Sequence, residues 1–242
     1  MEYFFILLRY IMNLKKLLSY FSLFEWILWL LSVSAILLSF LLCGDFYPLT
    51  LITSLLGVTA LIFIAKGNVI GQFLIIIFSI LYGIISYSFR YYGEMITYVF
   101  MSLPAAVFAC ISWLKNPSKK GASEVKVDTM SVSKWIWTAI ISLAITVIFY
   151  FILKYFNTEN LILSTISVTT SMFAASLLFL RSPYYALAYV ANDIVLIGLW
   201  AFASIQSLSY LPMVVCFVAF LCNDTYGFIN WNRMQKRQAE EE

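Results

Sequence analysis

The sequence predicts an all-α integral membrane protein with eight transmembrane helices. Hydrophobic residues make up 63% of the 242 residues and charged residues only 11%, which is too little polar surface for a water-soluble domain. The apolar residues fall into eight runs of about 18 to 21 residues, the length that a helix needs to cross roughly 30 Å of hydrocarbon. Trp and Tyr gather towards the ends of these runs, as is typical of side chains at a membrane interface.

The eight runs are separated by short polar or turn-forming joints. We place the spans near residues 26–43, 47–65, 70–88, 96–114, 135–153, 160–180, 184–204 and 211–230. Residues 21–237 are therefore expected to form a single transmembrane domain. Residues 1–20 carry basic residues after an apolar stretch and lack a small-residue cleavage site, so we expect an interfacial helix there and no signal peptide. Residues 238–242 are expected to be a solvated charged tail.

The distribution of positive charge predicts the topology. With eight spans, all but two of the 15 Lys and Arg residues fall on one side, and only Arg90 and Lys154 fall on the other. The positive-inside rule assigns the side rich in Lys and Arg to the cytoplasm. We therefore expect a multi-pass protein of the inner (plasma) membrane, with both termini and the polar connector 115–134 in the cytoplasm.

A weak internal repeat divides the spans into two triplets. Repeat one (47–114) and repeat two (160–230) each have a basic residue at their first joint, Lys66 or Arg181, and each ends in a Trp followed by a basic residue. Because three spans invert the chain, a linker helix at 135–153 is needed to give both triplets the same orientation. The pattern predicts two parallel three-helix repeats joined by a linker helix (3+1+3) plus an extra N-terminal helix. In transporters this arrangement places the substrate site at the repeat interface.

Two Asn-Asp pairs interrupt the last two spans. Asn192-Asp193 and Asn223-Asp224 both lie about 12 Å from the cytoplasmic end of their spans, at 1.5 Å per residue. An ionisable residue in a span costs roughly 2.5–3.5 kcal/mol on insertion scales and is usually functional. We therefore expect the two pairs to form one polar layer that binds a substrate.

Aromatic side chains surround this layer at helical spacing, and they offer stacking planes beside hydrogen-bonding groups, as a site for a flat ring with a polar appendage requires. The candidate substrate-binding residues are Asn192, Asp193, Trp200, Asn223, Asp224, Tyr226 and Tyr189, with Tyr82 and Gln72 as candidates for the facing wall. Glu94 is expected at the outer interface. The alternative is that these polar groups only hold neighbouring helices together, with no substrate involved.

Composition disfavours several other functional classes. The chain has no His, and its four Cys residues lie in apolar runs without metal-binding or redox spacing, so we expect no metal, no cofactor and no disulfide. A net charge of +3 is too small to indicate a nucleic-acid partner. No phosphate-binding loop is present, which argues against ATP hydrolysis. The chain is not expected to be an enzyme, and the remaining classes are a small-molecule transporter and a structural or accessory membrane subunit.

Several segments together resemble one transporter family. They are FEW at 24–26, YYGEM at 91–95 followed by Pro104, ANDIVLIGLW at 191–200 and NDTYGFINW at 223–231. With these segments the chain is similar to the PnuC family of vitamin transporters, best known for nicotinamide riboside. The resemblance implies a fold similar to the SWEET sugar transporters, a homotrimer, and facilitated diffusion with the substrate trapped by a cytoplasmic kinase. It also implies that Asn192 and Asn223 contact the substrate, with Trp200 and Tyr226 nearby.

The chain departs from the riboside transporters of that family at several positions. Those proteins carry a Trp pair where this chain has Tyr185 and Ala188, a Gln in place of Ala106, and an Asn near Gly71. The leading hypothesis is uptake of nicotinamide riboside or a closely related nucleoside-like vitamin precursor. A (deoxy)nucleoside, thiamine or riboflavin transporter, with or without proton coupling through the buried acids, remains the alternative.

Overall fold

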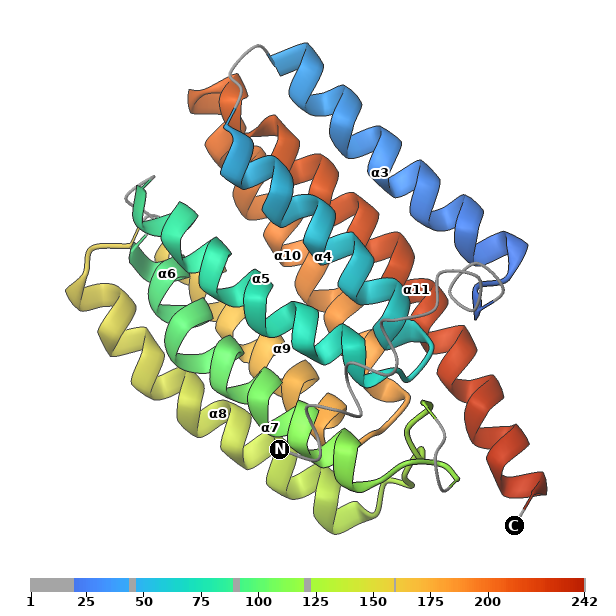
Figure 1. The fold of residues 1–242 in the computed structure, drawn as a ribbon. Coiled ribbons are helices and arrows are strands. Elements are labelled where there is room, and N and C mark those ends of the chain that lie inside the picture. Colours follow the sequence, from blue (N-terminus) through green and yellow to red (C-terminus); the bar gives the residue numbers. More distant parts are fainter. Residues whose placement is uncertain (1–19, 44–46, 89–91, 120–122, 159, 242) are drawn as a thin grey trace, which may run out of the picture.

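The computed structural model describes residues 20–43, 47–88, 92–119, 123–158 and 160–241. Every membrane span among these residues is helical (Figure 1). Eight of these spans are long and apolar enough to cross a membrane, as predicted. They are α3 (Leu23–Cys43), α4 (Pro48–Ala65), α5 (Val69–Ser88), the broken span α6 (Tyr92–Thr97), η1 (Tyr98–Ser102) and α7 (Leu103–Lys115), then α8 (Val132–Tyr155), α9 (Leu161–Phe179), α10 (Tyr184–Gln206) and, after η2 (Leu208–Tyr210), α11 (Leu211–Glu240). The interfacial helix expected at 1–20 lies outside the described residues, apart from Tyr20.

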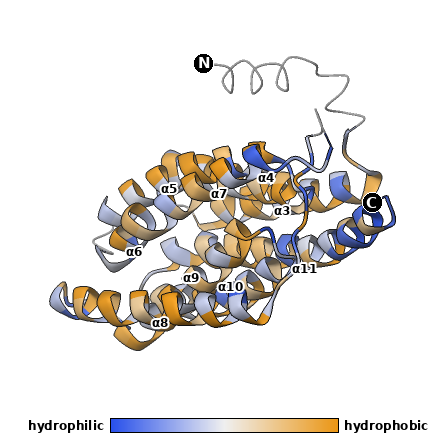
Figure 2. Cartoon of the chain, turned by 90° about the horizontal axis from the view of Figure 1, so that it is seen from below, coloured by the Kyte–Doolittle hydropathy of each residue, from blue (hydrophilic) through white to orange (hydrophobic). Residues whose placement is uncertain are grey.

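The helices pack as two groups of three with one helix at each edge. Helix α5 packs on both α4 and α7, and α10 packs on both α9 and α11. The two groups meet where α4 contacts α11 and α7 contacts α9. Figure 1 shows α3 at one edge beside α4 and α11, and α8 at the other edge beside α9. Apolar residues dominate every span, whereas the last turns of α11 are hydrophilic (Figure 2).

The turns from α4 to α5 and from α9 to α10 have the same backbone geometry. Gly67 and Arg181 both lie in the left-handed region, with φ of 63° and 58°. Gly67 N donates to Ile64 O at 2.8 Å, and Arg181 N donates to Leu178 O at 3.0 Å. Equivalent bonds therefore end the first helix of each group in the same way.

Two tryptophans join the groups at this end of the bundle. Trp113 Nε1 in α7 donates to Leu178 O at the end of α9 (3.1 Å), and Trp231 Nε1 in α11 donates to Ile64 O at the end of α4 (2.8 Å). Both indoles are buried and their ring centroids lie 5.4 Å apart. Each group thus holds the first helix of the other by a buried, directional bond.

The polar connector crosses the same end of the bundle, which we call the connector end. Its backbone bonds to both turns, because Val125 N donates to Gly67 O (2.9 Å) and Asp128 N donates to Arg181 O (3.0 Å). Val127 N donates to Gln238 Oε1 of α11 at 2.8 Å. Helix α11 continues to Glu240, so the residues expected to form a solvated tail include one that fastens the connector.

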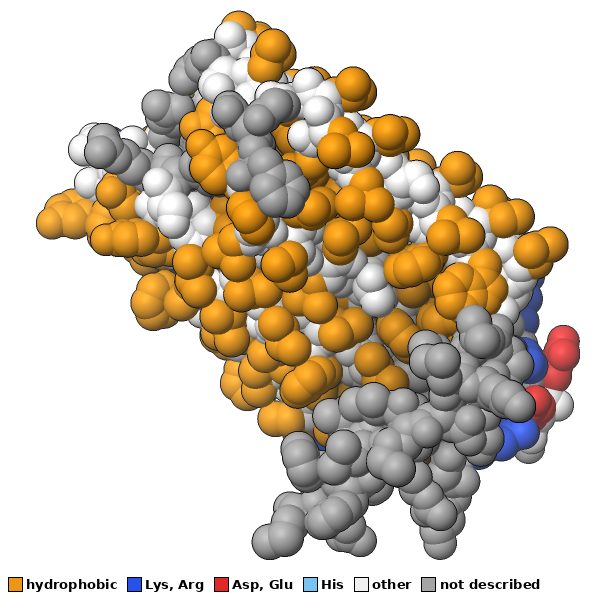
Figure 3. All heavy atoms as spheres, turned by 45° about the horizontal axis from the view of Figure 1, so that its top comes forward, with side chains coloured by type: hydrophobic (Ala, Val, Ile, Leu, Met, Phe, Trp, Pro, Cys, Tyr) orange, Lys and Arg blue, Asp and Glu red, His pale blue; other side chains and the backbone are white. Residues whose placement is uncertain are grey.

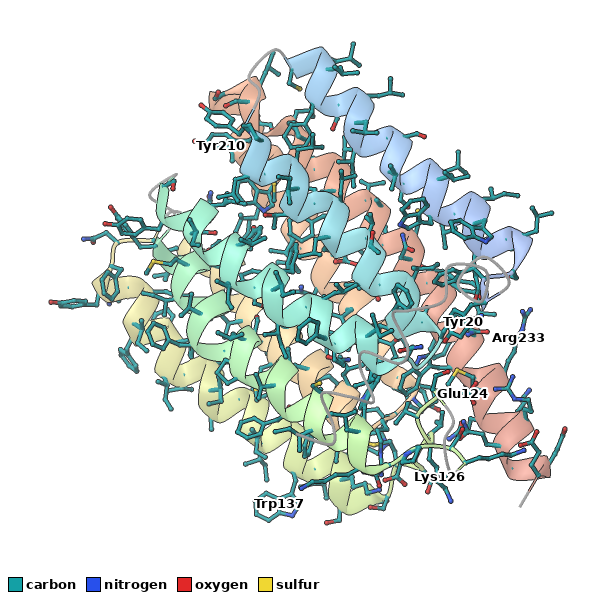
Figure 4. All side chains as sticks on the ribbon, viewed as in Figure 1. Tyr20, Glu124, Lys126, Trp137, Tyr210 and Arg233 are labelled. Carbon is teal, nitrogen blue, oxygen red and sulfur yellow. The ribbon has the colours of Figure 1, made fainter. Side chains whose placement is uncertain are left out.

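Charged side chains are concentrated at the connector end. Apolar side chains cover the sides of the helices in Figure 3, whereas Lys, Arg, Asp and Glu gather at one end. Figure 4 places Glu124, Lys126 and Arg233 at the connector end, and Tyr210 at the other end, which we call the opposite end. An apolar belt with one charged rim is what a membrane-spanning bundle requires.

Candidate functional site

A cavity of about 80 Å³ lies between the two groups of helices, with walls from α4, α5, η1 and α7 on one side and α9, α10 and α11 on the other. The polar side chains that line it are Gln72, Ser79, Ser102, Ser171, Asn192, Asp193 and Asp224. The aromatic side chains that line it are Phe78, Tyr98, Tyr185, Tyr189, Phe217 and Phe220. Hydrogen-bonding groups beside ring faces are the combination expected for binding a flat, polar molecule.

Asn192 is the best-oriented polar group in the cavity wall. Its Oδ1 accepts hydrogen bonds from the hydroxyls of Thr170 (2.8 Å) and Ser171 (2.9 Å) on α9. Because these donors fix the amide and occupy its oxygen, the N–H groups are what the side chain can offer to a ligand.

Asp193 and Asp224 meet across the interface of α10 and α11. Both are buried, both line the cavity, and their carboxyl groups are near enough to interact electrostatically. Two carboxylates this close repel each other in a site of low dielectric constant, so the pair holds at least one proton between them. None of the described residues that line the cavity is Lys or Arg. The cavity therefore favours a cation or a strong hydrogen-bond donor.

Gln72 faces the cavity from the first turn of α5. The side chain is fully buried, and neither amide atom has a hydrogen-bond partner among the described residues. A buried amide without partners is costly and rare in native structures. Gln72 is therefore a polar group that a ligand or water would satisfy.

Five of the nine residues predicted for the site line the cavity, and four do not. Tyr82 and Trp200 lie in an aromatic layer between the cavity and the opposite end, where Tyr82 packs on Tyr98 with ring centroids 4.1 Å apart. Asn223 faces α3 instead, and its Nδ2 donates to Ser32 Oγ at 3.1 Å. Successive residues on a helix point about 100° apart, and the rotation of α11 directs Asp224 to the cavity and Asn223 to α3. The expected polar layer is split between the two sides of α11.

Tyr226 also faces α3, where it binds a carboxylate that the sequence pattern did not single out. Tyr226 Oη donates to Glu25 Oε1 at 2.7 Å, and Lys66 Nζ lies 3.1 Å from Glu25 Oε2. Glu25 also accepts from Ser22 N, while Glu25 N donates to Ser22 Oγ. This reciprocal capping box was detectable in the sequence as Ser-x-x-Glu before an apolar run. Tyr226 therefore fastens α3 to α11 in this structure.

The cavity also includes residues that the helical spacing did not indicate. Tyr98 and Ser102 reach it from the π-helical segment η1, which lies directly before Pro104. Proline lacks an N–H and interrupts the regular bonds of the preceding turn, so Pro104 was the one available signal for this irregular wall. Tyr185 and Ala106, two positions that depart from the riboside transporters, both line the cavity. Glu94, expected at the outer interface, is buried.

The cavity is too small for a nucleoside in its present shape. Binding sites for small molecules usually have volumes of roughly 300–1,000 Å³, whereas this one measures about 80 Å³. It holds space for a few water molecules. The two groups of helices, or the side chains between them, must move apart before a ring-bearing molecule can enter.

Comparison with known proteins gives one consistent family. Residues 47–233 match the profile of the family described as nicotinamide mononucleotide transporter. The nicotinamide riboside transporter PnuC of Neisseria mucosa is 27% identical over 218 residues, which cover 88% of this chain and 82% of that protein. The protein of the same name from Haemophilus influenzae is 24% identical over 190 residues, covering 78% and 81%.

A solved structure agrees with these relatives. The crystal structure of the vitamin B3 transporter PnuC superposes with a TM-score of 0.77 at 26% identity, covering 90% of this chain and 94% of that one. The matched proteins are named as transporters and not as enzymes. The chain therefore belongs to the PnuC family of multi-pass membrane transporters.

Proposed function

We propose that the chain carries nicotinamide riboside, or a closely related nucleoside-like vitamin precursor, across the plasma membrane. The observation that carries this proposal is the cavity between the two helix groups, where Asn192 and the pair Asp193 and Asp224 face aromatic rings. The names of the relatives support the choice of nicotinamide riboside.

The electrostatics of the cavity support a cationic ring. The pyridinium of nicotinamide riboside carries one positive charge, and the acid pair supplies negative charge where no Lys or Arg lines the described wall. A phosphate group would find no cation there. The fixed amide of Asn192 and the free amide of Gln72 are suited to hydrogen bonds with the carboxamide or the ribose hydroxyls.

Transport follows from movement of the two groups about the cavity. We propose facilitated diffusion, in which the two repeats rock against each other and a cytoplasmic kinase traps the released substrate. The matching turns at Gly67 and Arg181 and the reciprocal Trp bonds support two related repeats. The charge at the connector end supports a cytoplasmic location for that end. A homotrimer is proposed from the family resemblance.

The test compares two asparagines that differ only in what they face. Purified protein is titrated with nicotinamide riboside, thiamine, riboflavin and a deoxynucleoside while Trp fluorescence is recorded. Nicotinamide riboside should quench, and Asn192→Ala should weaken its binding by roughly tenfold or more, the value of one or two lost hydrogen bonds. Asn223→Ala should leave affinity unchanged, because Asn223 faces α3. If only a different compound quenches the fluorescence, that compound would replace nicotinamide riboside as the proposed substrate. If no compound quenches it, the proposed transport function would be contradicted.

A second candidate mechanism is proton coupling, which the contact between Asp193 and Asp224 favours. If the shared proton leaves or enters during transport, uptake into proteoliposomes will vary with pH, and Asp193→Asn and Asp224→Asn will each abolish that variation while binding stays measurable. If uptake by the variants depends on pH in the same way as uptake by the parent, proton coupling is rejected and facilitated diffusion remains.

A further inference from the structure

The buried face of α5 carries polar side chains among apolar ones such as Phe78 and Ile85, whereas its exposed face is apolar. Gln72, Ser79, Tyr82 and Ser86 are buried, and their spacing of seven, three and four residues places them on one side of the helix. The exposed large side chains of α5 are Phe73, Ile80, Ile84 and Tyr87. Buried polar side chains opposite exposed apolar ones indicate that the interior side of α5 makes polar contacts, while the other side faces lipid.

Three of these four side chains have polar atoms that lack a hydrogen-bond partner in the described part of the chain. The hydroxyls of Ser79 and Ser86 are buried without a hydrogen bond among the described residues, as are both amide atoms of Gln72. By contrast, Ser88 on the same helix donates to Ile84 O at 3.0 Å, which is the usual bond for a serine in a helix. Buried groups of this kind are usually satisfied in native proteins by protein atoms or ordered water, so three on one helix face need an explanation.

The same face leads from the cavity to a buried carboxyl group. Gln72 and Ser79 line the cavity, Tyr82 lies in the aromatic layer beyond it, and Ser86 is one turn nearer to the opposite end. Gln72 and Ser86 are separated by about 21 Å along the helix, at 1.5 Å per residue. Glu94 on α6 lies beyond Ser86, towards the opposite end of the bundle. It is buried, and one of its carboxyl oxygens lacks a partner among the described residues.

Aromatic packing separates Glu94 from the cavity. Tyr98 lines the cavity and lies one helical turn after Glu94, and its ring contacts Tyr82 on α5. The pair Tyr82 and Tyr98 therefore closes the space between one carboxyl group near the opposite end and another inside the cavity.

We propose that the buried face of α5 lines the outward half of the translocation pathway, with Glu94 near its mouth as a residue that favours cations. Opening the contact between Tyr82 and Tyr98 joins Ser86 and Glu94 to the cavity and gives their unpaired atoms water or substrate as partners. This rests on the transport function proposed above and adds the route and a second site of charge selection to it.

The test uses single cysteines in a chain whose four native cysteines have been replaced. Ser86→Cys and Ser79→Cys place a thiol on the proposed path, and Ile84→Cys on the lipid side of the same helix is the matched control. Intact cells that retain uptake are treated with membrane-impermeant methanethiosulfonates, one cationic and one anionic. We expect Ser86→Cys to be modified fastest, Ser79→Cys more slowly and Ile84→Cys not at all. Modification of Ser79→Cys should be slower in the presence of nicotinamide riboside.

Glu94→Gln tests charge selection separately, because it keeps the side-chain volume. In the Ser86→Cys background it should lower the ratio of cationic to anionic modification rates by roughly tenfold. An unchanged ratio would remove Glu94 from the pathway. Active transporters in which neither Ser86→Cys nor Ser79→Cys is modified, from outside or in inside-out vesicles, would overturn the path itself. Modification without protection by nicotinamide riboside would keep the path and contradict the proposed substrate.

Discussion

The two ends of the bundle are closed by different kinds of interaction. At the connector end, Trp113 and Trp231 each donate a buried hydrogen bond to the other helix group, and the connector bonds to both turns. At the opposite end, contacts of aromatic rings such as Tyr82 with Tyr98 close the cavity, and the hydroxyl of Ser86 and one carboxyl oxygen of Glu94 lack partners among the residues that the structure describes. The connector end is held mainly by directional bonds, although Arg181 Nε and Nη1 there lack partners among the described residues, and the opposite end is held mainly by packing.

This difference indicates which end opens at lower cost. Hydrogen bonds that are broken in a buried place leave unpaired groups, so the connector end resists opening. Aromatic packing tolerates sliding, and opening the opposite end would hydrate groups that are now unsatisfied. The described structure is therefore a closed state, and we expect it to open at the opposite end more readily than at the connector end. Variants that remove interactions at each end should separate the two kinds of closure.

The largest loss of stability is expected from removing the carboxylate that holds α3 to the connector end. Glu25→Ala removes the partner of both Lys66 and Tyr226 and leaves a charge uncompensated, which should lower the stability by about 3 kcal/mol. Glu25→Gln keeps an acceptor for the tyrosine hydroxyl and should cost less. Thermal unfolding in detergent measures both. Equal stability of Glu25→Ala and the parent would show that the bonds of Glu25 do not help to hold α3 in place.

A smaller loss is expected from one indole at the connector end. Trp231→Phe removes the bond to Ile64 O and some buried volume, so we expect a loss of about 2 kcal/mol and easier opening of this end. Trp137→Phe is the matched control, because Trp137 is exposed and points away from the bundle (Figure 4). If both substitutions have the same effect on the unfolding temperature, the reciprocal Trp bonds do not hold the groups together.

The smallest loss of stability is expected from removing the ion pairs of the connector. Burial alone would raise the pKa of Asp128, but the hydrogen bond from Lys134, the N–H of Thr129 and the charge of Arg181 outweigh it and lower that pKa below the usual 3.8. A lowered pKa means that the stabilisation is complete above pH 3.8 and is lost as the pH falls through the folded value. Asp128→Asn should cost about 0.5 kcal/mol at pH 7, since the pair is partly exposed.

The pH profile of unfolding provides the control for Asp128. The parent should lose stability in acid more steeply than Asp128→Asn, whereas Glu241→Gln, which removes a carboxylate from an exposed ion pair, should follow the parent. Identical profiles for the parent and Asp128→Asn would show that the ion pairs of Asp128 do not help to fasten the connector.

The sequence was sufficient for the number and placement of spans, because hydropathy and span length depend on local composition. It was also sufficient to find Asn192, Asp193 and Asp224, since polar residues in apolar runs are conspicuous. It did not predict the direction of Asn223 and Tyr226, because their partners Ser32 and Glu25 lie on a helix nearly 200 residues away. Rotation of a helix about its axis is decided by tertiary packing, which hydropathy does not encode.

The break at Tyr98–Ser102 was missed for a similar reason. Pro104 indicated an irregular turn, but the shift to π-helical bonds that places Tyr98 and Ser102 in the cavity depends on how α5 and α7 pack around it. The charge of the connector predicted only that it lies in the cytoplasm. Its backbone bonds to Gly67 and Arg181 join segments that are distant in sequence, and no local pattern predicts them.

Distances across the two ends test the central claim most directly. Spin labels on Tyr87 and Leu208, both exposed, span the opposite end, and labels on Lys115 and Arg233 span the connector end. Pulsed electron paramagnetic resonance of the ligand-free protein should give a broad or divided distribution for the first pair and a single narrow one for the second. A narrow distribution at the opposite end together with a broad one at the connector end would contradict the difference in closure on which the proposed mechanism depends.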